Sequence, residues 1–149
     1  HRVGGDGPVT VAFLHGNRAG KDRFARAARH LPRDRRIVGI DCRGCGASDR
    51  PAATADFASD AVEVHARDML AALDRLGIDR CHLATHSTSG LIALHMDLMA
   101  ADRFPRMLAL APVPPGGLAF DAAAMAVFGA MRRDKAVTRR IMAKVAPSI

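Results

Sequence analysis

Short apolar runs alternate with amphipathic stretches along the first 117 residues of the chain. The spacing of the apolar positions predicts strands over residues 9–15, 36–41, 81–86 and 107–111, and helices over 21–31, 57–76 and 88–101. This order is typical of a parallel sheet covered by helices on both faces, with the functional loops at the carboxyl ends of the strands. The sequence therefore predicts an α/β fold.

The pattern changes after residue 117. Two amphipathic helices are predicted over residues 121–131 and 134–145, and no further strand follows. We expect residues 1–117 to form a partial core and residues 118–149 to form part of a helical lid. At the other end, residues 1–3 are expected to be the tail of a strand whose partner is missing.

Composition narrows the class of protein. The chain is 49% hydrophobic and 25% charged, which is ordinary for a globular protein, and its apolar runs are too short for a membrane span. The net charge of +7 comes from dispersed arginines, and without Trp or Tyr we expect no nucleic-acid partner. Cys42, Cys45 and Cys81 are expected to be free thiols in a reducing compartment, so a cytoplasmic location is predicted.

The segment 86–90 places a hydroxyl where a buried strand must reverse into a helix. A serine at such a turn projects from the sheet, and the N–H groups that follow it can bind an oxyanion. Ser87 is therefore a candidate nucleophile. The alternative is that Ser87 only caps the helix, since Ser is a preferred N-cap residue.

Three segments, in this order, resemble motifs of the α/β-hydrolase family. They are His15-Gly16-Asn17, the segment from Asp41 to Ser48 with Arg43-Gly44 and Gly46, and His86-Ser87-Thr88-Ser89-Gly90. The resemblance covers residues 5–117 and is nearest to the esterase and non-haem haloperoxidase group. It implies a parallel-sheet hydrolase core, here incomplete, a small-molecule acyl substrate, and no metal or organic cofactor.

The resemblance also implies roles for individual residues. Ser87 would be the nucleophile of the elbow, and the backbone N–H groups of Asn17 and Thr88 would form the oxyanion hole. Two positions depart from the family pattern, because Thr85 and Ser89 stand where the elbow usually has glycine. Cys45 stands where the family often has histidine.

A serine nucleophile needs a base and an acid that orients it. In the family both follow the nucleophile, but the single histidine after Ser87 is His95. It lies eight residues along the same predicted helix, about 12 Å away. We therefore expect the base and acid to come from outside this chain, from a missing C-terminal part or a second chain. The predicted function is a serine hydrolase that cleaves a carboxylic ester or related acyl compound through an acyl-enzyme on Ser87, with this chain alone inactive.

Four other interpretations concern the same core or parts of the same sequence. The same core could hold a ligand without catalysis. The segment 16–22 is a remote match to a phosphate-binding loop, but three residues separate its glycines and Asp22 follows Lys21. A dinucleotide fingerprint at residues 44–49 lacks its third glycine. His82 and His86 share a strand face about 13 Å apart, too far to bind one metal ion.

Overall fold

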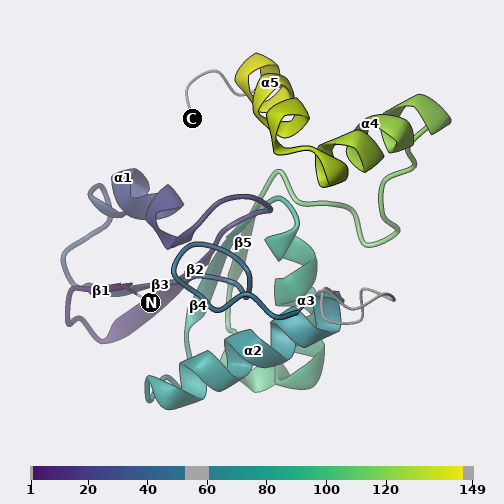
Figure 1. The fold of residues 1–149 in the computed structure, drawn as a ribbon. Helices are drawn as coiled ribbons and strands as arrows, with labels where there is room; N and C mark the ends of the chain where they lie inside the picture. Colours follow the sequence, from purple (N-terminus) through teal and green to yellow (C-terminus); the bar gives the residue numbers. More distant parts are fainter. Residues whose placement is uncertain (1, 53–60, 146–149) are drawn as a thin grey trace. The chain divides into compact units, whose positions relative to one another are not determined.

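A computed structural model describes residues 2–52 and 61–145, and the chain divides into two compact units, His1–Pro115 and Gly116–Ile149 (Figure 1). In the described part of the first unit, five strands form one sheet in the order β1-β3-β2-β4-β5. The strands are β1 (Arg2–Gly4), β2 (Val9–Leu14), β3 (Arg35–Ile40), β4 (His82–His86) and β5 (Met107–Leu110). Strands β2 to β5 are parallel, which confirms the predicted fold class.

The first strand corrects one expectation. β1 pairs with β3 in antiparallel register, with Val3 opposite Val38, so the prediction of a strand without its partner was wrong. The sequence does not reveal this pairing because the two strands are separated by β2 and α1. β3 has one edge on β2, and β1 covers the other.

The helices of this unit are η1 (Lys21–Phe24), α1 (Ala25–Ala28), α2 (Val62–Arg75), α3 (Ser89–Met99) and η3 (Ala101–Arg103). The helix predicted over residues 21–31 is instead a 3₁₀ turn followed by one short α-turn. Its end continues in i to i+3 bonds, as in His30 N–H to the Ala27 oxygen at 3.0 Å. Pro32 explains the early end, because the residue before a proline is disfavoured in helical conformation. Residues 57–60 of the second predicted helix lie outside the described residues.

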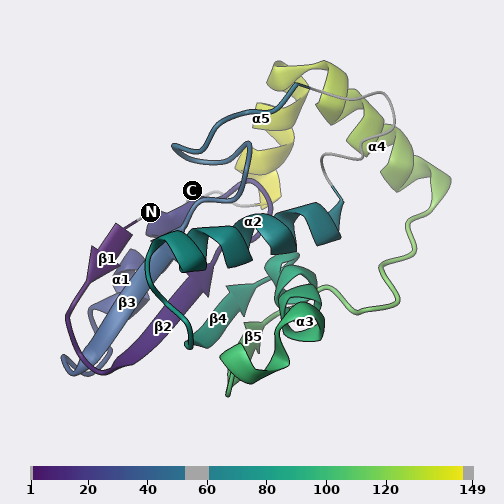
Figure 2. The same ribbon diagram turned by 90° about the horizontal axis from the view of Figure 1, so that it is seen from below.

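The alternation along β2 divides the core between two faces of the sheet. Ala12 and Leu14 pack with α2 and α3, whereas Phe13 stacks on Phe24 with ring centroids 4.6 Å apart. Figure 2 shows α2 and α3 on one side of the strands and α1 on the other. Burial of the apolar side chains on both faces is the main stabilising term for such a layered sheet.

The second unit contains α4 (Ala122–Arg133) and α5 (Lys135–Val145), close to the predicted helices. Asp121 caps α4 by accepting the Ala124 N–H at 2.7 Å. The Thr138 hydroxyl donates to the Met131 carbonyl oxygen at 2.7 Å, which joins the two helices. Neither these helices nor any other described helix is long and apolar enough to cross a membrane.

Candidate active site

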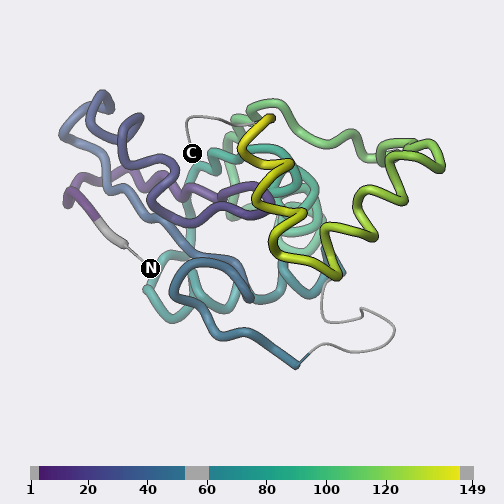
Figure 3. Tube along the Cα trace, turned by 45° about the horizontal axis from the view of Figure 1, so that its top comes forward, coloured from purple at the N-terminus to yellow at the C-terminus, as the bar shows by residue number. Residues whose placement is uncertain are grey.

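The loops that follow β2 and β3 are joined by one buried carboxylate. Asp41 accepts hydrogen bonds from the Lys21 N–H and the Lys21 Nζ, both at 2.6 Å, and from the Ala47 N–H at 3.0 Å. Burial alone would raise the pKa of Asp41, but these donors outweigh it and lower the pKa to about 2. Asp41 is therefore ionised at neutral pH and fixes both loops, whose course Figure 3 follows.

His15 holds the loop after β2 from inside. Its Nε2 accepts the Cys42 N–H at 3.0 Å, so the hydrogen is on Nδ1, which donates to the Gly16 carbonyl oxygen at 2.8 Å. His15 as a whole residue is 2% exposed. With both ring nitrogens engaged and no access to solvent, His15 shapes the loop and is not a free base.

Ser87 lies between the end of β4 at His86 and the start of α3 at Ser89. Its φ is 59°, in the left-handed region that residues other than glycine seldom adopt. The Ser87 N–H donates to the Leu110 carbonyl oxygen at 3.0 Å, and the Ser87 carbonyl oxygen accepts the Gly90 N–H at 3.1 Å. Such strain persists only where surrounding bonds over-determine the conformation, and it is common at functional sites.

Two glycines let the chain pass closely around this turn. A Cβ on Gly16 would lie 2.9 Å from the Cβ of Ser87, so the loop after β2 touches the serine directly. A Cβ on Gly90 would lie 2.9 Å from the Cβ of Pro112, which follows β5. Both positions need glycine because a neighbouring segment occupies the space of a side chain.

Ser89, one of the two departures from the family elbow, is fully buried and bridges two strands. Its hydroxyl accepts the His86 N–H at 2.9 Å and donates to the Leu14 carbonyl oxygen at 2.7 Å, with the His86 carbonyl oxygen also at 2.9 Å. Ser89 therefore connects the end of β2 to the turn at Ser87, a contact that glycine at this position would not provide.

Thr85, the other departure, fits in the strand without a polar partner. It is 1% exposed, and its Oγ1 makes no hydrogen bond to the residues that the structure describes. The left-handed conformation falls on Ser87 and not on Thr85, so the β-branched side chain does not oppose the turn.

The two residues predicted for the oxyanion hole are in direct contact. The Asn17 N–H donates to the Thr88 Oγ1 at 3.1 Å, so the side chain of one predicted member engages the amide of the other. Thr88 is the N-cap residue of α3, but its side chain does not cap the helix. No acceptor for the Thr88 N–H occurs among the described residues. The sequence predicted the proximity of these residues but not this hydrogen bond.

A cavity of about 470 Å³ opens beside this contact at the carboxyl ends of the strands. Its lining comes from the loops after β2 and β3, the turn between β4 and α3, and the helices α2 and α3; it includes Asn17, Thr88, Cys45, His65 and Ile92. Ser87 is not among the lining residues and lies next to two of them, Gly16 and Thr88.

The sequence matches the α/β-hydrolase fold family model over residues 9–147. This chain belongs to that family. It is 31% identical to a fluoroacetate dehalogenase of Burkholderia sp over 112 residues, covering 75% of this chain and 36% of the relative. It is also 31% identical to a 2-hydroxy-6-oxononadienedioate/2-hydroxy-6-oxononatrienedioate hydrolase of Klebsiella pneumoniae over 108 residues, covering 70% and 36%.

A solved structure supports the same family assignment. The structure of Est816, described as an N-acyl homoserine lactone degrading enzyme, superposes with a TM-score of 0.73 and 27% identity, covering 86% of this chain and 47% of that one. The chain spans about a third of the length of the curated relatives it matches. It therefore represents one part of a hydrolase-family core.

Within this hydrolase core, no described residue makes a hydrogen bond to the Ser87 hydroxyl. His95 lies within α3, and both nitrogens of His15 are engaged. His65, which sequence reasoning missed, lines the cavity from α2. The feature that could have indicated His65 is its position next to Ala66, at the edge of the buried stripe of that helix.

The cysteines of the core are all free. Burial, together with the nearby Cys45, Asp41 and Asp68, raises the pKa of the Cys42 thiol to about 12. Burial raises the pKa of Cys45 and brings that of Cys81 to about 11. The thiols are protonated at neutral pH and are not activated nucleophiles. In the described part of the chain, no three side chains of His, Cys, Asp or Glu are placed to hold one metal ion.

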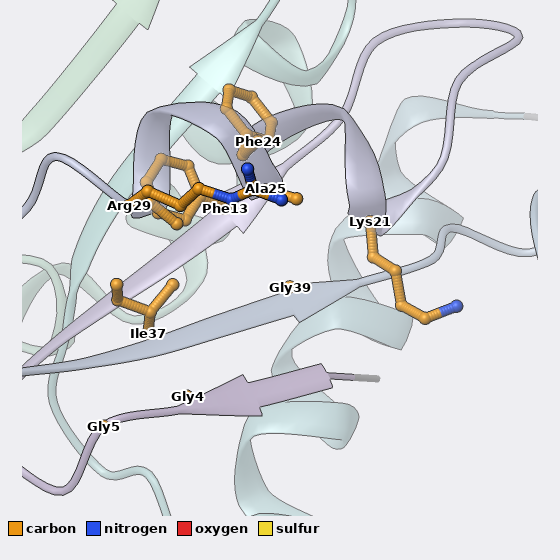
Figure 4. A pocket seen from close by; sticks show the side chains of 10 residues that line it. Gly4, Gly5, Phe13, Lys21, Phe24, Ala25, Arg29, Ile37 and Gly39 are labelled. Atoms are coloured by element: carbon orange, nitrogen blue, oxygen red, sulfur yellow. The ribbon is translucent and has the colours of Figure 1, made fainter.

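A second cavity, of about 340 Å³, lies on the other face of the sheet between α1 and the strands (Figure 4). Phe13, Phe24, Arg29 and Ile37 line it, and none of the predicted site residues does. Lys21, the lysine of the remote phosphate-loop match, binds Asp41 with its ammonium group. The nucleotide-binding reading therefore gains no support.

Proposed function

We propose that this chain is part of a serine hydrolase that cleaves a carboxylic ester or a related acyl compound. The proposal depends on Ser87, whose left-handed backbone at the β4–α3 junction brings its Cβ against Gly16 of the loop after β2. The relatives support it at a coarser level, because one is named a dehalogenase and one a hydrolase. Est816 is described as degrading an N-acyl homoserine lactone, which contains a cyclic ester.

In the proposed reaction, the Ser87 Oγ forms a bond to the acyl carbon while its proton passes to a histidine from outside this chain. The carbonyl π electrons move to the oxygen, and the oxyanion is held by donors at Thr88 and Asn17. When the oxyanion collapses, the bond to the alcohol oxygen breaks and the alcohol takes the proton from the histidine. Water then attacks the acyl-enzyme in the same way and releases the acid.

We further propose that the base and acid come from sequence or a chain that completes the sheet beyond β5. Strands of parallel sheets are normally buried on both faces. Yet every residue of β5 is exposed, including Leu108 at 59% and Leu110 at 46%, and the neighbouring α3 exposes Leu98 at 83%. This apolar surface supports a further strand and helix packed there.

The substrate we propose is a small acyl compound in the cavity beside Thr88. Val62 and Ile92 give it apolar walls, whereas His65 adds a polar group. We propose that residues 118–149 form a lid segment, because α4 and α5 are a compact helical pair with exposed apolar side chains such as Met125 and Phe128. We also propose a cytoplasmic location, which the three free thiols support.

A non-catalytic ligand-binding protein is the second candidate. The Asn17 amide is already occupied by Thr88, and no described residue activates Ser87. A ligand-binding protein with this core would need the cavity, but it would need neither a free Asn17 amide nor an activated Ser87.

The test uses the complete protein that carries this sequence, assayed with a panel of p-nitrophenyl esters of increasing acyl length. We expect turnover that Ser87→Ala reduces by at least about 10⁴-fold with an unchanged unfolding temperature. Ser48→Ala is the matched control, because Ser48 lies in the neighbouring loop and donates to the Asp41 carbonyl oxygen. Turnover that survives Ser87→Ala would exclude Ser87 as the nucleophile, and saturable ligand binding without turnover would favour the second candidate.

A further inference from the structure

The hydrogen bond between Asn17 and Thr88 changes how the oxyanion hole must work. The Thr88 hydroxyl oxygen accepts a hydrogen bond from the Asn17 N–H at 3.1 Å. If the backbone N–H groups of Asn17 and Thr88 both bind the oxyanion directly, this hydrogen bond must first break. We propose instead that the Thr88 hydroxyl is itself a catalytic oxyanion donor, polarised by the Asn17 amide. The inference rests on the proposed function and refines its mechanism.

The hydrogen-bonding capacity of Thr88 supports this role. A hydroxyl can accept one hydrogen bond and donate another, and accepting strengthens it as a donor. Its acceptor side is used by Asn17, and within the described residues its hydrogen is donated to no acceptor. The hydrogen therefore stays available for a substrate oxygen.

The position of Thr88 favours the same conclusion. Threonine at the start of a helix usually caps it, yet here the side chain leaves α3 uncapped and faces the loop after β2. Thr88 also lines the cavity and is half-buried, so a ligand can reach it. The N–H and the hydroxyl belong to one residue, only three bonds apart, so one oxygen atom can meet both.

Ser89 and His15 keep the arrangement rigid. Ser89 ties the turn to the Leu14 carbonyl oxygen, and His15 ties Gly16 to Cys42. Asn17 and Thr88 thus come from two segments that are fixed to each other before substrate binds. Donors arranged in advance stabilise a developing charge most effectively, because no reorganisation is needed during the reaction.

The experiment compares Thr88→Val, which keeps the shape and removes the hydroxyl, with Thr88→Ser, which keeps the hydroxyl, in the complete protein. For Thr88→Val we expect kcat to fall by about 10²- to 10³-fold with KM changed less than about threefold. Thr88→Ser should retain kcat within about fivefold. Thr88→Ala repeats the hydroxyl deletion if the valine variant unfolds, and thermal unfolding of each variant is measured.

A second readout separates oxyanion stabilisation from a structural role. A trifluoromethyl ketone forms a hemiketal oxyanion on a serine nucleophile, so its inhibition constant should rise by about the same factor as kcat/KM falls. The corresponding secondary alcohol, which forms no oxyanion, should bind equally to wild type and Thr88→Val. A structural defect would weaken both compounds together.

Each outcome decides the proposal. Unchanged kcat in Thr88→Val would overturn it, and increased kcat would show that the hydroxyl competes with substrate for the Asn17 amide. Both results leave the nucleophile assignment intact if Ser87→Ala is inactive. Wild-type protein with no Ser87-dependent turnover would overturn the proposed function as well.

Discussion

Single side chains around the turn at Ser87 explain how this turn forms with Thr85 and Ser89 at the two positions where the family elbow usually has glycine. Ser89 contributes hydrogen bonds that a glycine lacks, whereas Thr85 places a hydroxyl in the sheet without a partner among the described residues. One departure is thus stabilising and the other carries a desolvation cost of about 1–3 kcal/mol. The effects of Ser89 and Thr85 on the free energy of unfolding can be measured separately by mutation.

Ser89→Ala should lower the free energy of unfolding by about 2 kcal/mol, because it removes the hydrogen bonds of a fully buried hydroxyl to the Leu14 oxygen and the His86 N–H. Urea denaturation of wild type and variant measures the difference. Ser48→Ala, which removes one half-buried hydrogen bond, should cost about 1 kcal/mol. Equal effects of the two variants would contradict the bridging role of Ser89.

Thr85→Val should raise the free energy of unfolding by about 1 kcal/mol, because a methyl group replaces a buried hydroxyl of similar volume. The urea midpoint should increase with an unchanged m-value. A destabilised variant would show that the Thr85 hydroxyl has a partner in the folded protein.

At the scale of elements, the order of strands and helices was predictable, whereas their pairing and local helix type were not. Apolar runs and amphipathic spacing located β2 to β5, α3, α4 and α5. The helix predicted over residues 21–31 was too long, because its apolar positions follow a helical period up to Leu31 whereas the α-helix itself covers only Ala25–Ala28 before Pro32. The partner of β1 depends on which sheet edge is free, which no local pattern encodes.

The candidate site was also predictable only where it depends on a local sequence pattern. Ser87 could be placed because a strand meeting a helix without a linker requires a sharp turn. The bond between Asn17 and Thr88, and the position of His65 on the cavity, depend on how separate elements pack. Such contacts between distant segments leave no periodic signal in the sequence.

The hydrogen bonds by which Asp41 joins the loops after β2 and β3 predict that the stability of the fold depends on pH. Because the folded-state pKa of Asp41 is lowered from 3.8 to about 2, its contribution is present above about pH 4 and is lost as the pH falls from 4 to 2. Asp41→Asn should therefore be about 2 kcal/mol less stable than wild type at pH 6, and most of this gap should be lost by pH 2. Urea denaturation at several pH values measures it; a gap independent of pH would contradict the role of ionised Asp41.

At the scale of the whole molecule, β5 and α3 expose an apolar surface that an isolated domain would rarely leave open. The 149-residue chain expressed alone should therefore self-associate in sedimentation velocity as its concentration increases. Leu108→Lys, which places a charge on the exposed strand, should reduce this association, whereas Ala101→Lys on η3 should not. A monomer at all concentrations would contradict the proposal that this surface is normally covered.

Ser87 is the residue that we propose as the acyl-transfer nucleophile, held in place by its turn. The most direct measurement treats the complete protein with a fluorophosphonate probe and maps the adduct by mass spectrometry. We predict one modified residue, Ser87, with labelling abolished by Ser87→Ala and retained by Ser48→Ala. Absence of labelling in a folded complete protein, or an adduct on a different residue, would contradict the proposed role of Ser87.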